Sequence, residues 1–449
     1  MEIIIKLSQF LLSLSLLIIL HELGHFIPAK LFKTRVEKFY LFFDVKFSLF
    51  KKKIGDTVYG IGWLPLGGYV KIAGMIDESM DTDQMKQEPQ PWEFRSKPAW
   101  QRLIIMLGGV TVNFVLAFVI YIGMAYVYGD SYLKNDDLKD GISVTNPVLQ
   151  KAGLQTGDKI VSVDGHIIER FNDLPEALLV GVGKDVVLER NGVQQTITLP
   201  ADLIGQVVDE NSKSLVSLRI PFVIAGFAEG SANEGKLQPK DVVLSVNGEP
   251  LRYYDQVEVA MSKYKGQTVP MEVLRDEKKT VVDVTVDKDG KLGVFNGLVG
   301  MQDMERMGYY TLSHDKYSFL ESIPVGLEKG KDKVVGYWKQ LKLMVSPETG
   351  AYKGVGGFKA IFDIFPQFWS WELFWSITAI LSIMLGVMNL LPIPALDGGH
   401  VMFLLYEMIS GRKPSDKFME NAQMVGFFIL IGLLLFANGN DIYKAILGK

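Results

Sequence analysis

Four stretches of the chain are long and apolar enough to cross a lipid bilayer, and they lie near its two ends. They cover residues 3–27, 100–128, 371–393 and 421–440, and each approaches the roughly 20 apolar residues that a membrane-spanning helix needs. The first has no basic start and no small-residue cleavage site, so we expect a retained span rather than a signal peptide. The pattern predicts an α-helical polytopic membrane protein with about four transmembrane helices.

The segment between the second and third spans contains an internal repeat. Residues 154–165 match residues 237–248, and each copy has an apolar run, IVSV or VLSV, followed by Asp-Gly or Asn-Gly. Such a run is typical of a strand that enters a tight hairpin turn. A short helical pattern and further strand patterns follow in both copies. We therefore expect two tandem β-rich domains, at 131–212 and 213–305.

The rest of the chain divides around these domains. We expect an N-terminal membrane part at 1–130, a linker at 306–369 and a C-terminal membrane part at 370–449. Within the linker, GLEKGKDKVVGYWKQLKLMV alternates basic and apolar residues at helical spacing. This pattern predicts an amphipathic helix on the outer membrane surface or against the β-rich domains, although an ordinary solvated helix has the same pattern.

Charge gives an orientation and excludes some functions. The connector 30–97 and the connector between the last two spans are rich in Lys and Arg, which places both in the cytoplasm and the β-rich domains outside it. The net charge of −4 argues against nucleic acid as the main partner. The chain has no cysteine, which excludes disulfides, thiol catalysis and zinc bound by cysteine.

The candidate chemistry lies at the end of the first span, where the chain reads HELGH. On a helix, His21 and His25 share one face, so both imidazoles can reach one metal ion. Glu22 lies beside them and can take a proton from water bound to that metal. Because ionisable residues at the end of a long apolar run are costly without a partner, the motif predicts a catalytic Zn²⁺ site.

A catalytic zinc takes three protein ligands and a water, so a third ligand must come from elsewhere. The late apolar region ends in NLLPIPALDGGH, where prolines and glycines interrupt the helix and let the backbone bend toward a site. Asp397 is the preferred ligand. His400, three residues later, is the competing one.

These motifs resemble the site-2 protease family of intramembrane zinc metalloproteases, in particular its bacterial regulator-of-sigma-E type. HELGH lies in a first span, N-x-x-P-x-x-x-x-D-G lies in a late span, and the repeated domains between them resemble PDZ domains. The resemblance implies that His21, His25 and Asp397 bind zinc and that Glu22 is the catalytic acid/base. It implies that substrate is held near the zinc by Asn389 and Pro392.

The resemblance also implies partners and a location. The expected substrates are single-span membrane proteins, such as trimmed anti-sigma factors or remnant signal peptides, in the bacterial inner membrane. The zinc site would lie near the cytoplasmic side, and the PDZ-like domains would lie in the periplasm and bind peptides or exclude bulky proteins. Two positions depart from the family pattern, because Val110 and Phe358 stand where proline is usual.

Residues 56–71 suggest how a substrate could be held. This segment is β-rich, apolar and punctuated by glycine, and it follows the zinc helix. We expect a hairpin that dips into the membrane and pairs with unwound substrate at an edge formed by Gly60, Ile61 and Gly62. A cytoplasmic hairpin that only supports the fold is the alternative.

Two other functions are compatible with parts of the sequence. A non-catalytic membrane PDZ scaffold would close a structural zinc site with a fourth ligand, for which His400 is available. A glutamate beside a ligand has no purpose in such a site. A metal transporter would be expected to repeat its spans, whereas the repeat found here lies between them.

Overall fold

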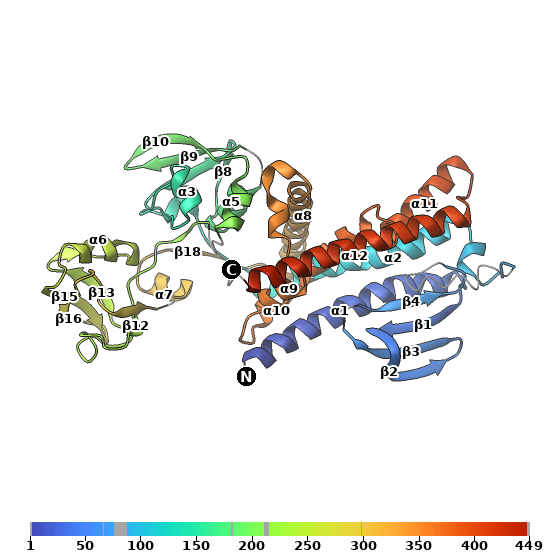
Figure 1. Ribbon diagram of the computed structural model, residues 1–449, viewed down its shortest axis with the longest axis horizontal. Coiled ribbons are helices and arrows are strands. Elements are labelled where there is room, and N and C mark those ends of the chain that lie inside the picture. Colours follow the sequence, from blue (N-terminus) through green and yellow to red (C-terminus); the bar gives the residue numbers. More distant parts are fainter. Residues whose placement is uncertain are drawn as a thin grey trace. The chain divides into compact units, whose positions relative to one another are not determined.

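The computed structural model describes residues 2–65, 67–75, 88–180, 183–210, 215–297 and 299–446. The chain divides into two compact units (Figure 1). The first, which we call the membrane unit, contains the residues up to Gly129, Lys316–Met344 and the residues from Val355 onward. The second, the β unit, contains Asp130–Asp315 and Val345–Gly354.

Four helices in the described part of the chain have the length and composition of membrane spans. They are α1 (Glu2–Leu31), α2 (Ala99–Val127), α10 (Trp371–Leu390) and α12 (Asp416–Ile446). Their most apolar windows have mean hydropathies between 1.9 and 2.6. The prediction of four long apolar helices, two on each side of the β-rich segment, is therefore confirmed.

Small residues let the other helices of this unit approach α2 closely. A Cβ at Gly108 would lie 1.9 Å from the carbonyl oxygen of Gly24 on α1, so only glycine fits at this crossing. The expected linker helix is α8 (Phe319–Met344). It packs on α2 within the membrane unit, where Gly326 meets Ile122. The described residues of the unit also form two shorter α-helices, α9 (Phe358–Ile364) and α11 (Asp397–Ser410).

A four-stranded sheet lies beside α1 in the membrane unit, with β4 nearest the helix and β2 farthest from it (Figure 1). Its strands are β1 (Val36–Leu41), β2 (Phe43–Ile54), β3 (Thr57–Leu64) and β4 (Tyr69–Ile72), in the order β2-β3-β1-β4. The expected hairpin within 56–71 is wrong, because β1 lies between β3 and β4. The hairpin is formed by β2 and β3.

The β unit contains two modules with the same strand order. The first sheet is β8-β7-β9-β10 and the second is β14-β13-β15-β16. The strands of the first are β7 (Lys159–Val163), β8 (His166–Ile167), β9 (Asp185–Arg190) and β10 (Val193–Thr198). Those of the second are β13 (Val242–Val246), β14 (Glu249–Pro250), β15 (Thr268–Arg275) and β16 (Lys278–Thr285). The repeat in the sequence is thus a repeat of topology.

Smaller elements complete each module. Three two-stranded pairs are β5 (Asp130–Leu133) with β18 (Leu312–Asp315), β6 (Ile142–Ser143) with β11 (Ser217–Leu218), and β12 (Ile224–Phe227) with β17 (Val294–Asn296). The short helices are α3 (Pro147–Lys151), α4 (Leu174–Leu179), α5 (Leu203–Asp209), α6 (Val257–Ser262) and α7 (Met301–Arg306). Helices α4 and α6 lie where the two helical patterns predict them.

The two predicted hairpin turns have the backbone that their sequences favour. Asp164 and Gly165 have φ of 50° and 75°, and Asn247 and Gly248 have φ of 47° and 81°. Positive φ at both central positions is the type I′ geometry that matches the twist of the flanking strands. Each module has its own hydrophobic core. That of the first also includes Leu218, beyond the boundary expected at 212/213, and Met304 and Tyr310, which follow the second module in sequence.

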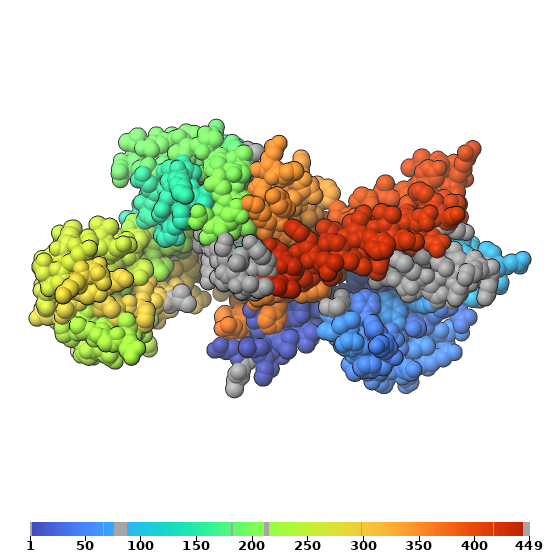
Figure 2. Space-filling view, in the orientation of Figure 1, coloured from blue at the N-terminus to red at the C-terminus, as the bar shows by residue number. Residues whose placement is uncertain are grey.

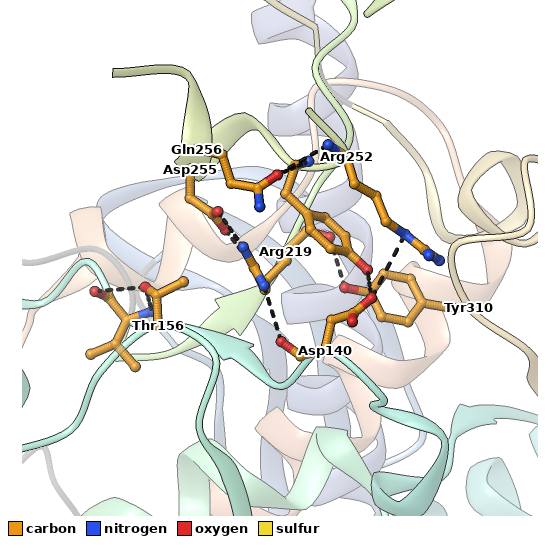
Figure 3. A network of polar contacts seen from close by, with 9 residues as sticks. Asp140, Thr156, Arg219, Arg252, Asp255, Gln256 and Tyr310 are labelled. Atoms are coloured by element: carbon orange, nitrogen blue, oxygen red, sulfur yellow. Dashed lines mark hydrogen bonds and ion pairs between the residues drawn. The ribbon is translucent and has the colours of Figure 1, made fainter. Parts of the chain in front are cut away.

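A polar network joins the two modules (Figure 3). Arg219 forms two hydrogen bonds to the carboxylate of Asp255, of 2.9 and 2.7 Å, and donates to the carbonyl of Asp140 in the first module at 3.2 Å. The Tyr253 hydroxyl donates to the Asp140 carboxylate. Burial, together with this hydrogen bond, raises the pKa of Tyr253, so the phenol remains the donor.

Candidate active site

The HELGH motif lies inside α1, on the face that meets α2. At this level α2 carries Gly109, where a Cβ would lie 2.3 Å from Nε2 of His25 and 2.7 Å from Cε1 of His21. The missing side chain leaves the space that the two imidazoles fill. The glycines of α2 therefore allow the close helix crossing and also leave space for the two imidazoles.

The structure brings His21, His25 and Asp397 together from α1 and the start of α11. The two Nε2 atoms are 3.3 Å apart. Asp397 Oδ2 lies 3.3 Å from Nε2 of His25 and 3.5 Å from Nε2 of His21. Among the described residues, these three form the group of His, Asp and Glu side chains close enough to hold one metal ion.

The spacing of these three atoms fits zinc. Ligands at 2.0–2.1 Å in a tetrahedron are about 3.3–3.4 Å from one another, and the three measured distances are 3.3, 3.3 and 3.5 Å. Oδ2 of Asp397 is buried and has no hydrogen-bond donor, although buried carboxylate oxygens normally have one. The donor set of two imidazoles and one carboxylate is that of several catalytic zinc sites.

Hydrogen bonds to residues of α2 orient both histidines. Nδ1 of His25 donates to the carbonyl of Ile105 at 2.9 Å, which leaves Nε2 free to face the ligand cluster. Nδ1 of His21 lies 3.0 Å from the carboxamide of Asn113, which is fully buried and whose Oδ1 has no other partner. A half-turn of the carboxamide makes Oδ1 the acceptor for Nδ1–H, as metal binding through Nε2 requires.

Asp397 is the first residue of α11, directly after the proline-rich loop. A carboxylate at a helix N-terminus is stabilised by the unpaired N–H groups and the helix dipole. The loop makes a tight turn in which Ala395 has φ of 77°. The competing ligand lies elsewhere, since Nε2 of His400 is 2.8 Å from the Gln423 amide of α12.

Glu22 is half-buried on the turn of α1 that carries both histidines. A Cβ at Gly68, at the entrance to β4, would lie 3.6 Å from Cγ of Glu22. The segment that leads into β4 is therefore next to the Glu22 side chain. The arrangement has the parts of a metal-dependent hydrolase: three ligand atoms, a carboxylate beside them and a strand edge next to both.

Comparison with known proteins agrees with this chemistry. Residues 9–433 match the family described as Peptidase family M50. The chain belongs to peptidase family M50. It is 26% identical over 448 aligned residues to a zinc metalloprotease-like chain of Xylella fastidiosa, covering 96% of this chain and 97% of that one.

Two further relatives have more specific names. A protein of Haemophilus influenzae named Regulator of sigma E protease is 26% identical over 466 residues, covering 98% of this chain and 99% of that one. Metalloprotease MmpA of Caulobacter vibrioides is 24% identical over 456 residues, covering 98% and 96%. The M50 chain is thus a zinc metalloprotease, and the resemblance to the site-2 protease family is confirmed.

The remaining candidate residues of the M50 chain lie on two segments. Asn389 is half-buried in the last turn of α10, and Pro392 is exposed in the loop before Asp397. Gly60 and Gly62 lie in β3, where side chains would collide with neighbours. A Cβ at Gly60 would lie 2.3 Å from the Tyr40 ring, so tight packing explains this glycine. The substrate-binding role of these residues stays a prediction.

The expected edge position of Gly60, Ile61 and Gly62 is wrong. Ile61 pairs with Leu41 of β1 on one side and with Phe50 of β2 on the other. The edges of this sheet are β2 and β4. The G-x-G pattern marks close packing, and local patterning could not reveal that a strand from earlier in the chain inserts beside it.

Asn113 is the site residue that the sequence did not single out. The signal was an amide in the middle of an apolar span, four residues after Gly109. Because α-helical residues four apart share a face, both can face the same neighbour. Only the crossing of α1 and α2 shows that this neighbour is the HELGH motif.

Proposed function

We propose that this M50 metalloprotease cleaves the transmembrane segments of single-span membrane proteins, such as trimmed anti-sigma factors or remnant signal peptides. The observation that carries the proposal is the position of the ligand cluster. His21 and His25 lie within the apolar helix α1, and Asp397 follows the apolar helix α10 directly. A site between such helices favours a peptide bond at membrane depth.

The residues have distinct roles in this proposal. His21, His25 and Asp397 would hold one zinc ion, which when bound lowers the pKa of water and polarises the scissile carbonyl. Glu22 accepts the proton of the attacking water and delivers it to the leaving amine. Asn389 and Pro392, in and after the last turn of α10, would position the substrate backbone.

We assign the substrate-pairing edge to β4 instead of β3. Strand β4 is the edge strand on the α1 side of the sheet, and the residue before it, Gly68, lies beside Glu22. An extended substrate that adds to this edge would have its backbone amides hydrogen-bonded while its helix is unwound. The sheet would then lie within the membrane boundary, with the zinc site near the cytoplasmic side of a bacterial inner membrane.

The orientation of the chain rests on its basic connectors, which favour a cytoplasmic location. The β unit would then lie in the periplasm. We interpret its two modules as PDZ-like domains, because both have the same sheet order and a helix at the same place in chain order, α4 between β8 and β9 and α6 between β14 and β15. They would exclude substrates that still carry a large outer domain.

The structure suggests a clean way to test this exclusion. Asp130 in β5 pairs with Asp315 in β18, so the main segment of the β unit, Asp130–Asp315, begins and ends at neighbouring positions. Replacing 130–315 with a short Gly-Ser linker should preserve the membrane unit. The variant should cut untrimmed and trimmed substrates at similar rates, whereas the full chain prefers trimmed ones. An unchanged preference in a folded, zinc-loaded variant would remove the exclusion role.

The proteolytic function itself is tested with Glu22→Gln. This change keeps the size of the side chain and removes the base, so zinc content should be retained while cleavage of a model single-span substrate falls at least about 100-fold. Gln423→Glu, on α12 outside the ligand cluster, is a control that also exchanges an amide and a carboxylate. Full activity of purified, zinc-loaded Glu22→Gln would exclude Glu22 from the reaction.

The alternative is a non-catalytic membrane PDZ scaffold with a structural zinc. It needs a fourth protein ligand. The nearest candidate in sequence, His400, is in contact with Gln423 and is not part of the ligand cluster. This contact favours an open coordination position and therefore the catalytic interpretation.

A further inference from the structure

The outer part of the sheet in the membrane unit carries an unusual combination of exposed residues. Figure 2 shows the sheet as a blue lobe that stands out from the helices of the same unit. On its outer hairpin, Phe47, Leu49 and Trp63 are 56%, 66% and 43% exposed. Large apolar side chains exposed together normally have an apolar partner.

Contacts with α1 show how this hairpin is placed relative to the span. The Lys30 amine donates to Thr57 at the start of β3, at 2.9 Å. Two residues further along β3, the Tyr59 ring lies 6.0 Å from the ring of Phe26. Strand β3 therefore runs back along α1 from its end toward its middle.

The lengths of the strand and of the helix agree with this direction. From Thr57 to Trp63, β3 advances about 20 Å, and the twelve residues of α1 from Lys30 back to Ile18 cover about 18 Å. At the far end of the sheet, a Cβ at Gly68 would lie 2.4 Å from the side chain of Ile18. The end of the hairpin that carries Trp63 is thus level with the apolar middle of α1.

The opposite end of the hairpin carries the charge. Lys51, Lys52 and Lys53 are exposed and pair with the first half of β3, where Lys53 is opposite Val58. They lie near the level of Lys30, where α1 leaves its apolar stretch. Within the described residues, none of these three lysines forms an ion pair with a carboxylate. Three cations at the boundary of a membrane span attract anionic headgroups.

The backbone of the outer strand agrees with a position at the membrane boundary. Strand β2 is an edge of the sheet, and its pairing with β3 is interrupted around Ser48. Unpaired backbone groups are not tolerated in contact with hydrocarbon, so part of this edge must face headgroups or water. Trp63 reduces the number of unpaired backbone groups on β2, because its indole N–H donates to the carbonyl of Val45 at 2.7 Å.

We propose that the β2–β3 hairpin binds anionic phospholipid, with Phe47, Leu49 and Trp63 against the acyl chains and Lys51, Lys52 and Lys53 at the headgroup phosphate. The proposal rests on the membrane placement of the sheet given under "Proposed function", but not on proteolysis. Because the same sheet reaches Glu22 through Gly68, bound lipid would help to hold the edge strand beside the active site.

Trp63 supplies a direct readout in the full-length protein. The chain is reconstituted in phosphatidylcholine vesicles that contain a small, equal fraction of acyl-brominated phosphatidylglycerol or acyl-brominated phosphatidylcholine. The chain has 7 tryptophans, so the signal of Trp63 is the difference between the native chain and Trp63→Phe. Quenching of this difference signal should be greater with phosphatidylglycerol, corresponding to about fivefold enrichment of anionic lipid at the hairpin.

Matched variants identify the residues responsible. Lys51→Gln/Lys52→Gln/Lys53→Gln should abolish the preference for phosphatidylglycerol but retain quenching by both lipids, and the corresponding arginine triple should keep the preference. Lys278→Gln/Lys279→Gln/Lys288→Gln, in the β unit, removes the same charge and should change nothing.

Three results would overturn the proposal. One is a preference that survives in the glutamine triple of the hairpin, and another is a preference that is lost equally in the control triple. The third is a Trp63 signal that neither lipid quenches, which would place the hairpin outside the bilayer. The proteolytic function is judged separately, by cleavage and zinc content of the same samples.

Discussion

Aspartates with buried carboxylate oxygens have opposite surroundings in the two units of this protein. In the β unit, Asp158 accepts two hydrogen bonds from Arg190, of 2.7 and 2.8 Å, and one from the backbone of Gln155. The second module repeats this arrangement, with Asp241 bonded to Arg275 at 2.8 and 2.6 Å and to the backbone of Gln238. In the membrane unit, Asp397 has two imidazoles nearby and an oxygen without a donor.

The difference separates structural from functional acids. A buried carboxylate with an arginine and a backbone N–H is fully satisfied, so it stabilises one local fold. A buried carboxylate that is left short of donors is costly unless a further group completes it. Its place beside two histidines identifies that group as a metal ion. The number of hydrogen-bond donors around the carboxylate, and not the residue type or the burial of its oxygens, therefore distinguishes the metal site.

The largest effect is expected when the unsatisfied acid is removed. Asp397→Ala should lower zinc affinity by more than about 100-fold, because one of three ligands is lost, and cleavage should disappear with it. His400→Ala, three residues later, should keep zinc. Metal analysis after equilibration with a chelator measures both variants. Greater zinc loss in His400→Ala would make His400 the ligand.

Removing a satisfied acid should have a local effect on folding. Asp158→Ala removes the buried acceptor of Arg190 and of the Gln155 N–H, and leaves Arg190 only its hydrogen bond to the Gly153 carbonyl. This should cost about 3 kcal/mol, so amide hydrogen exchange in β7 and β9 should accelerate by about 100-fold. Zinc content should not change. Asp241→Ala should do the same in β13 and β15 only. Zinc loss in Asp158→Ala would contradict the division into structural aspartates and a metal-binding aspartate.

A third prediction concerns the support of the metal site. Asn113→Leu keeps the number and branching of the side-chain heavy atoms and removes the polar contact to His21, so zinc affinity should fall about 10- to 100-fold. Asn113→Asp retains an acceptor for Nδ1–H of His21 and should preserve most of the affinity. The measurement is zinc competition with a chelator. Equal affinities of the native chain and Asn113→Leu would show that Asn113 only fills space.

The smallest effect is expected at the contact between the two modules. Arg219→Gln removes hydrogen bonds of a charged group and should weaken the contact by about 1–2 kcal/mol, without affecting zinc. The chain has no cysteine, so spin labels can be attached at Val193→Cys and Val281→Cys, which are exposed in the two modules. The distance distribution between the labels should broaden in Arg219→Gln. Equal widths would mean that other contacts hold the modules.

The sequence predicted those features that depend on local periodicity. The spans follow from apolar runs, the turns at Asp164 and Asn247 follow from the glycine after each, and the shared face of His21 and His25 follows from helical spacing. Asp397 was reachable as well, because prolines and glycines interrupt the helix just before it.

Features that depend on distant pairing were missed or misplaced. The parallel pairing of β1 with β3 joins segments across an intervening strand, and no local pattern distinguishes it from a simple hairpin within 56–71. For the same reason Ile61 was expected at an edge and lies in the interior of the sheet. The contact between Asn113 and His21 spans 92 residues and depends on how two apolar helices cross.

The most direct test of the central claim combines zinc content with the position of the cut. The purified native chain is reconstituted with a model single-span substrate, zinc is quantified, and the products are mapped by mass spectrometry. The account predicts one zinc ion per chain and a cut within the apolar segment of the substrate, abolished by a chelator and restored by zinc. A zinc-loaded native chain that cuts only outside the apolar segment, or does not cut at all, would contradict it.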